Sequence, residues 1–259
     1  MRKPTPFNEI YKHKGSDTAV FLGCGTSINR ITKKQWKQIS KFDTWASNNF
    51  LYHDFIPKFY HVEIKRNKNL GTWTEWRKIK GKKYDKVVFI VKDHPKRKFL
   101  LEAVDSNRSK FVYGYHLRKI NNHAKGIKPN YKIKGSHITC NCNASFTMIL
   151  EMLYKFKYKN VVLFGVDMND SRYFWSDMSV EVGGKGPRRT IQYKGVKVHC
   201  NTNKDHVPNQ PHTTSHLVTY IKGFNEIYMK KIGSRIYVGN KDTLLYPALP
   251  YIDIMKVKV

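Results

Sequence analysis

The stretch NASFTMILEMLYKFKYKNVVLFGVDMND, residues 143–170, is the best-patterned part of the chain and decides the fold class that we predict. Apolar residues recur at helical spacing over 145–156, and a short lysine-bearing turn follows. The run 160–164 is apolar without alternation, which is typical of a parallel strand buried on both faces. It ends in Gly165-Val166-Asp167. A helix, a short loop and a buried strand in this order indicate an α/β fold.

The rest of the chain repeats this alternation. An apolar run at 18–22 leads into a glycine turn, and a helix is expected at 29–40. Further strands are expected at 43–47, 58–62, 86–92 and 234–240. A second helix is expected at 214–231, with Thr214 or Ser215 as its N-cap. The segments 98–104 and 112–117 fit either type. We therefore expect a Rossmann-like (GT-A-like) doubly wound, mostly parallel sheet.

The chain is long enough for one large domain. Its 259 residues and 40% apolar content predict a single nucleotide-sugar-binding domain over 1–259. Residues 170–205 contain several glycines and little helical periodicity, so we interpret them as a small lid or insertion within that domain. We interpret the four cysteines as reduced thiols, which favours a cytoplasmic protein.

The formal net charge of +29 predicts an anionic partner. Nucleic acid, an anionic membrane surface, a phosphorylated glycan or a nucleotide sugar would each fit. Lysines are scattered from end to end, however, and there is no helix-turn-helix, zinc-finger or RNP-like motif. A non-enzymatic nucleic-acid-binding module is therefore disfavoured, although it stays an alternative.

Three candidate site elements follow predicted strands, where ligands of doubly wound sheets bind. The first is Gly23-Cys24-Gly25 with the hydroxyls of Thr26 and Ser27, whose backbone amides could cradle a phosphate. It is neither a Walker A loop nor a GxGxxG motif, and a tight structural turn would explain it equally well. The second is Asn48-Asn49, which suits a base edge or a sugar or forms a plain turn. The third is Gly165-Val166-Asp167, whose aspartate could hold a ribose hydroxyl or a metal, or cap a loop, although a metal needs more hard ligands than one loop offers.

Further candidates lie late in the chain. His206 follows an aspartate and could act as a general base, or be an ordinary surface histidine. Tyr173 could hydrogen-bond a leaving phosphate, and Arg188-Arg189 could bind an anionic acceptor; lid packing and solvated charge explain them as well. Cys140 and Cys142 are too close in sequence for a usual zinc pair, and no HExxH pattern occurs, so we expect no metal site.

The order of these pieces resembles a known family. VFLGCGTSI, FDTWASNNFLY, FYHVE, the Ser145 helix, YKNVVLFGVDM, His206 and IYVGNKDTLL together are similar to the small bacterial sialyltransferases of Campylobacter type, glycosyltransferase family 42. The resemblance extends over most of residues 18–247. It implies a Rossmann-like fold with a lid over the active site.

The resemblance also implies roles for individual residues. The nucleotide and donor would be bound by Gly23, Cys24, Gly25, Thr26, Ser27, Asn48, Asn49, Ser145, Gly165 and Asp167, with Tyr173 at the leaving phosphate and His206 as the catalytic base. The chain departs from the family at four places. Cys24 replaces an asparagine, and His61 or Glu63 stands where a second donor asparagine occurs. Asn169 or Asp170 occupies the region of the second lid tyrosine, and Cys142-Asn143-Ala144 replaces Arg-x-Thr.

The implied activity is transfer of sialic acid or a related acidic sugar from a CMP-sugar to a glycan hydroxyl, with inversion and without a metal or other cofactor. The acceptor would be a cell-surface polysaccharide, lipooligosaccharide or glycolipid, reached by peripheral contact with an anionic membrane at its inner face. The alternatives within the same fold are a pterin pyrophosphokinase-like or a motility-associated glycosyltransferase-like enzyme. Homo-oligomer formation stays open.

Overall fold

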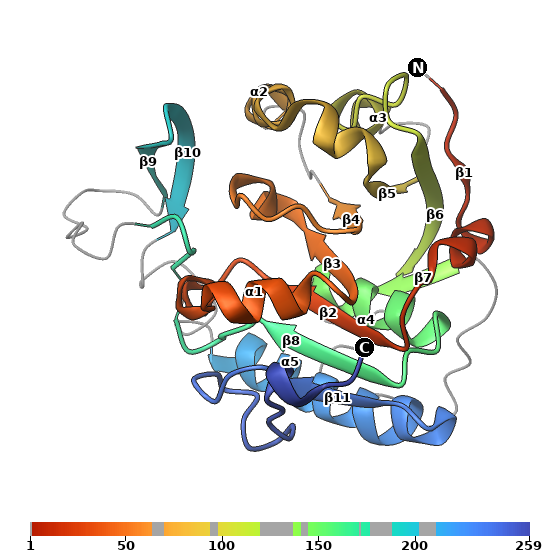
Figure 1. Ribbon diagram of the computed structural model, residues 1–259, viewed down its shortest axis with the longest axis vertical. Helices are drawn as coiled ribbons and strands as arrows, with labels where there is room; N and C mark the ends of the chain where they lie inside the picture. Colours follow the sequence, from red (N-terminus) through yellow and green to blue (C-terminus); the bar gives the residue numbers. More distant parts are fainter. Residues whose placement is uncertain are drawn as a thin grey trace.

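The fold is built on one large parallel sheet. A computed structural model describes residues 2–63, 70–93, 98–119, 137–140, 145–170, 172–176, 188–201 and 211–259. Nine strands pair in the order β1-β6-β5-β4-β3-β2-β8-β11, with β7 also beside β6, and every pairing is parallel (Figure 1). The strands are β1 (Thr5–Pro6), β2 (Thr18–Leu22), β3 (Asp43–Ser47), β4 (Phe59–Val62), β5 (Val88–Lys92), β6 (Phe111–Lys119), β7 (His137–Cys140), β8 (Asn160–Phe164) and β11 (Arg235–Val238).

The strand order reverses direction between β2 and β8. From β2 the chain adds β3, β4, β5 and β6 on one side, whereas β8 and β11 lie on the other side. The connections that leave the carboxyl ends of β2 and β8 therefore diverge to opposite faces of the sheet. A crevice forms at such a topological switch point, and ligands of doubly wound sheets bind there.

Helices cover both faces, which gives the α/β fold that the sequence predicts. On one face α4 (Ser145–Lys155) and α5 (Pro211–Phe224) pack against Phe21 of β2 and Trp45 of β3. On the other face Leu22 and Ala46 lie in the core shared with α1 (Lys33–Ile39), α2 (Leu70–Lys80) and α3 (Phe99–Ala103). Neighbouring residues of one strand thus enter different cores. Among the described residues, no helix combines the length and the apolarity that crossing a membrane would require.

Several element boundaries differ from those predicted. The single helix expected at 29–40 is a 3₁₀ turn, η2 (Thr26–Arg30), followed by α1, because Thr32 is extended and caps α1 through a reciprocal bond with Gln35. Helix α5 begins at Pro211, so Thr214 and Ser215 lie inside it and neither is its N-cap. Of the two ambiguous segments, the first contains α3 and the second lies in β6, whereas α2 had no sequence prediction.

Part of the expected insertion is a β-hairpin packed on α2. Strands β9 (Arg188–Tyr193) and β10 (Val196–Asn201) pair antiparallel as a separate two-stranded sheet. Val196 and Val198 are buried, and the Tyr193 ring lies 6.1 Å from that of Trp76 in α2. His206, the predicted base, lies outside the described residues.

A buried carboxylate ties together the amino ends of the central strands. Asp43, which is 2% exposed, accepts hydrogen bonds from the Tyr158 hydroxyl and the Gly15 amide, both at 2.9 Å. The Lys58 ammonium lies 2.6 Å from its other oxygen, and the Trp45 indole donates to Tyr158 at 3.1 Å. Burial raises the pKa of Tyr158, so its hydroxyl keeps the proton that it donates to Asp43.

We predict that Asp43→Ala lowers the free energy of unfolding by about 2–4 kcal/mol, because it leaves Tyr158 and Lys58 without their buried acceptor. Urea unfolding at neutral pH measures the change. The matched control is Asp17→Ala, which removes an exposed carboxylate that pairs with Lys14 and Lys159, and its urea midpoint should stay close to that of the parent protein. Equal losses in the two variants would contradict a special role for Asp43.

Candidate functional site at the topological switch point

Two glycine-containing turns meet at the carboxyl ends of β2 and β8. The Gly23 amide donates to the Phe164 carbonyl at 2.7 Å, and the Gly25 amide donates to the Gly165 carbonyl at 2.9 Å. A Cβ atom on Gly23 would lie 2.2 Å from the Gly165 carbonyl oxygen, and Gly165 itself has φ +67°. Close approach of the two turns therefore requires glycine at both positions.

The Asp167 carboxylate fixes the turn after β2. It is 5% exposed and accepts from the Ser27 amide at 2.9 Å and from the Ser27 hydroxyl at 2.5 Å. Burial raises the pKa of Asp167, and the hydrogen bonds from Ser27 oppose this change. A Cβ atom on Gly25 would lie 2.4 Å from an Asp167 carboxylate oxygen, so this carboxylate position requires glycine there.

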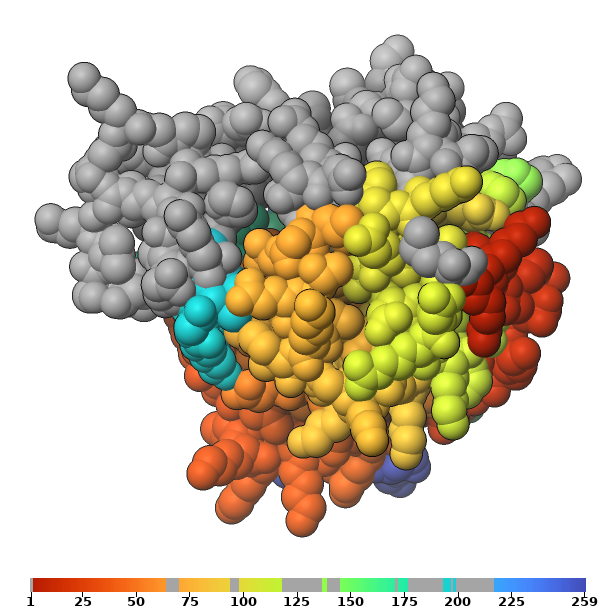
Figure 2. Space-filling view, turned by 90° about the horizontal axis from the view of Figure 1, so that it is seen from above, coloured from red at the N-terminus to blue at the C-terminus, as the bar shows by residue number. Residues whose placement is uncertain are grey.

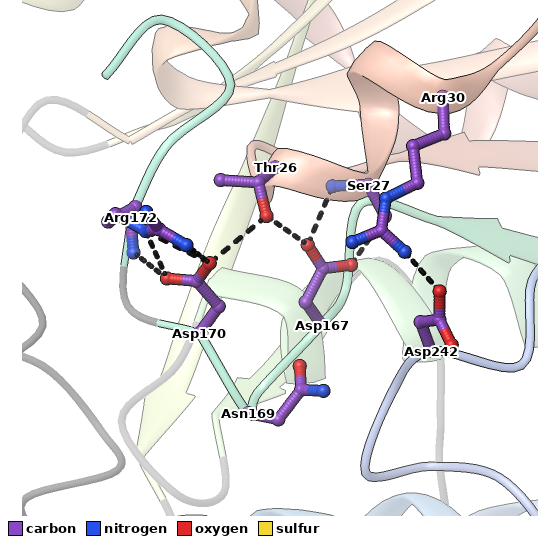
Figure 3. A pocket seen from close by; sticks show the side chains of 8 residues that line it. All are labelled: Thr26, Ser27, Arg30, Asp167, Asn169, Asp170, Arg172 and Asp242. Carbon is purple, nitrogen blue, oxygen red and sulfur yellow. Dashed lines mark hydrogen bonds and ion pairs between the residues drawn. The ribbon is translucent and has the colours of Figure 1, made fainter. Parts of the chain in front are cut away.

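A polar pocket of about 260 Å³ opens beside these turns (Figure 3). Arg172 donates to Asp170 at 2.7 Å, and Arg30 forms an ion pair with Asp242 from the segment after β11. Burial alone would raise the pKa of Asp170, but the hydrogen bonds from Arg172 lower it overall. The residues that line the pocket are Thr26, Ser27, Arg30, Asp167, Asn169, Asp170, Arg172 and Asp242.

A second polar cluster lies at the ends of the adjacent strands β3 and β4. The Asn48 amide donates to the Ser145 hydroxyl at 3.0 Å, and that hydroxyl donates to the Glu63 carboxylate. Asn48 adopts φ +52°, and the Tyr60 hydroxyl donates to its carbonyl at 2.6 Å. The buried Asn48 Oδ1 has no hydrogen-bond partner among the described residues, so it can accept one more hydrogen bond.

His61 is buried beneath this cluster as a neutral imidazole. It is fully buried, and its Nε2 lies 2.9 Å from the Tyr115 hydroxyl. Burial lowers the pKa of His61 to about 4, although the nearby Glu63 charge acts in the opposite direction. His61 thus occupies the core and does not present a charge to a ligand at neutral pH.

Two predicted site residues pack around the glycine turn. Tyr173 forms an isolated antiparallel bridge with Gly25, and its ring stacks on Trp175 at a centroid distance of 4.3 Å. The Cys24 thiol faces the Ser47 carbonyl at 3.8 Å, and burial raises its pKa to about 12, so it remains protonated. Neither side chain lines the pocket.

The structure gathers the predicted residues into two groups. Thr26, Ser27 and Asp167 line the pocket, while Asn48 and Ser145 join in the second cluster. Asn49 is half-buried in the 3₁₀ turn η3 (Asn48–Tyr52), and Arg188 and Arg189 belong to β9. The sequence prediction had given no role to the pocket residues Arg30, Asn169, Arg172 and Asp242.

Among the described residues, no three histidine, cysteine, aspartate or glutamate side chains are grouped so that they could hold a metal ion. Comparison of the sequence with protein-family models finds no match, and comparison with curated proteins finds none. The site is therefore interpreted from its own geometry.

We predict that Gly23→Ala destabilises the fold by about 1–3 kcal/mol, because its methyl group would meet backbone atoms of the neighbouring turn. The matched control is Gly71→Ala in α2, where an added Cβ meets nothing within 4 Å and helix propensity should give a small gain in stability. Thermal unfolding compares the two variants. A stability loss confined to Gly71→Ala would contradict the proposed contact between the turns.

We also predict that His61 makes the folded state less stable in acid. Its folded pKa of about 4 lies below the ordinary 6.5, so between these values the unfolded chain binds a proton that the folded chain does not. Stability attributable to His61 is therefore lost as the pH falls, by about 1.4 kcal/mol per unit within this window. His61→Gln should flatten the pH dependence of the unfolding free energy by that amount. An unchanged slope between parent and variant would show that His61 is not buried as a neutral group.

Proposed function

We propose that the chain is a glycosyltransferase that transfers a sugar from a nucleotide-sugar donor to a glycan hydroxyl with inversion. The narrower form of this proposal is that the donor is a CMP-linked sugar. The observation that carries this proposal is the polar pocket at the switch point of the sheet, between the glycine turn after β2 and the acidic turn after β8.

The pocket suits the nucleoside part of such a donor. The carboxylates of Asp167 and Asp170 and the hydroxyl of Thr26 can accept hydrogen bonds from ribose hydroxyls. Arg30 and Arg172 offer guanidinium donors to an attached phosphate, which would compete for them with their present partners Asp242 and Asp170. Asp170 is held by Arg172 and Asp167 by Ser27, so a metal-bridged diphosphate is a weaker match to this donor set.

The second cluster suits the sugar part of the donor. Strands β8, β2, β3 and β4 are successive neighbours, and adjacent strands lie about 4.8 Å apart. A donor anchored at Asp167 can therefore extend over the glycine turn toward Asn48 and Ser145. The Glu63 carboxylate beside Ser145 favours hydroxyl or amide groups and would repel an acidic sugar. The test must therefore include donors whose sugar is uncharged.

The proposed reaction assigns three roles. The acceptor hydroxyl oxygen attacks the anomeric carbon, the bond from that carbon to the phosphate oxygen breaks, and His206 takes the hydroxyl proton. The Tyr173 hydroxyl stabilises the departing phosphate, and the Ser145 hydroxyl does so when it turns away from Glu63, its acceptor in the structure. Arg188 and Arg189 bind an anionic acceptor.

The first experiment measures thermal shifts with CMP, CDP, UDP, GDP and ATP, each with and without Mg²⁺. We expect CMP to raise the melting temperature without Mg²⁺, since a ligand that binds only the folded state stabilises it. Asp170→Asn should reduce this shift. The matched variant Asp54→Asn should retain it, because Asp54 forms an exposed ion pair with Lys194 and does not line the pocket. A shift that needs a diphosphate with Mg²⁺ would favour a pyrophosphokinase-like enzyme, and the absence of any shift would make the pocket purely structural.

The second step of this experiment follows nucleotide release in the presence of a lipooligosaccharide acceptor: CMP from CMP-sialic acid, or UDP from UDP-sugars whose transferred sugar is neutral. His206→Ala should abolish release while the CMP thermal shift survives. His116→Ala, at an exposed histidine of β6, is the matched control. Full activity in His206→Ala would contradict the assigned base.

A further inference from the structure

A lysine-rich surface lies on the side of the molecule that α1 covers. This surface consists of the exposed side chains of residues 31–42, which include α1, and of residues 254–259, which include the 3₁₀ turn η11 (Ile254–Lys256). We call it the α1–tail face. Residues 31–42 and 254–259 contain no aspartate or glutamate. The exposed lysines of this face are Lys33, Lys34, Lys37, Lys41, Lys256 and Lys258.

Packing holds the two parts of this face together. Ile254 and Val257 are buried in the same core as Ile39 of α1, and the Gln38 amide donates to the Val257 carbonyl at 2.9 Å. Figure 2 shows the orange-red side chains of the α1 region and the blue end of the chain on the same side of the molecule. The lysines therefore form one surface, although they are far apart in sequence.

The described part of the chain provides no ion pair for the positive charge of this face. None of its lysines forms an ion pair with another described residue. The carboxylates nearest in the sequence are Asp43, which is buried and pairs with Lys58, and Asp253, which accepts from the Met255 amide and caps η11. These lysines are therefore available to an anionic partner, and the cap on η11 fixes the backbone that carries Lys256.

Apolar side chains are exposed among these lysines. Met255 is 47% exposed and Val259 is 75% exposed, and they alternate with Lys256 and Lys258. The buried Ile254 and Val257 anchor this segment in the core, while Met255 and Val259 are exposed to solvent. Lysines that flank exposed aliphatic groups can reach lipid headgroups while the aliphatic groups enter the acyl boundary.

We propose that the α1–tail face docks the protein on an anionic membrane surface, with its lysines on the phospholipid headgroups and Met255 and Val259 at the acyl boundary. The face holds lysines and no arginine, and its exposed apolar groups are aliphatic. Bidentate phosphate recognition by arginine and stacking on aromatic rings, which nucleic-acid sites use, are absent from these residues. Lipid therefore fits the face better than nucleic acid.

Docking would bring the candidate site to the edge of the membrane. Arg30 lines the pocket and ends η2, and α1 begins three residues later with Lys33. The proposal does not depend on the proposed function, because the face is defined by residues outside the pocket.

The test is co-sedimentation of the full chain with phosphatidylcholine vesicles that do or do not contain phosphatidylglycerol. We expect binding only with the anionic lipid, and a loss of at least about a hundredfold in affinity when the lysines of the face are neutralised, since each lysine near an anionic surface contributes to binding. The variant replaces Lys33, Lys34, Lys37, Lys41, Lys256 and Lys258 by glutamine. The control of equal net charge replaces the exposed Lys78, Lys82, Lys83, Lys86, Lys110 and Lys231.

A second variant, Met255→Ser with Val259→Ser, keeps the charge and should weaken binding most at high salt, where headgroup attraction is screened. Circular dichroism and thermal unfolding verify that each variant is folded. Equal losses in the face variant and the charge control would overturn the proposal, as would equal binding to neutral vesicles. Tighter binding of a DNA duplex with the same lysine dependence would also overturn it, in favour of nucleic acid.

Discussion

The candidate site depends on the contact between two turns that leave neighbouring strands in opposite directions. Amide groups of the turn after β2 donate to carbonyls of the turn after β8, and the absence of a side chain at Gly23 permits this distance. Asp167 then extends the contact from backbone to side chain by holding Ser27. The same glycines that look like a phosphate-binding motif are required first by packing. Any ligand function of these glycines would be additional to this structural one.

Charge is distributed unevenly around this contact. The pocket concentrates carboxylates in a chain that carries a large excess of lysine, and two arginines compensate for part of them. The interior of the neighbouring cluster, in contrast, contains an uncharged His61 and a single carboxylate on Glu63. The proposed attraction of an anionic surface by lysines and the proposed orientation of a sugar by acceptor groups are therefore compatible, because long-range attraction and local hydrogen bonding act at different distances.

Much of the fold could be predicted from sequence, because buried parallel strands are recognisable as short apolar runs. The strands at 18–22, 43–47 and 160–164 are confirmed to the residue. Helix α2 was missed, since its buried apolar face is made largely of Trp73 and Trp76, which stand among polar and charged residues. In the site, Thr26, Ser27 and Asp167 could be found because they follow strands. Asp242 could not, because its place in the pocket depends on β11 lying beside β8, and no local pattern encodes that neighbourhood.

The segment after β11 supports the acidic turn from outside. The Thr243 hydroxyl donates to the Val166 carbonyl at 2.7 Å, and the Leu244 amide donates to the Asp167 carbonyl at 3.0 Å. These residues leave the ribosome after every strand of the sheet has been translated. A nascent chain can therefore assemble most of its hydrophobic core while the pocket still lacks one wall. The same stretch also completes the core, because Leu245, Leu249 and Ile254 are buried, so a premature stop before Asp242 would remove part of both hydrophobic cores together with this wall of the pocket.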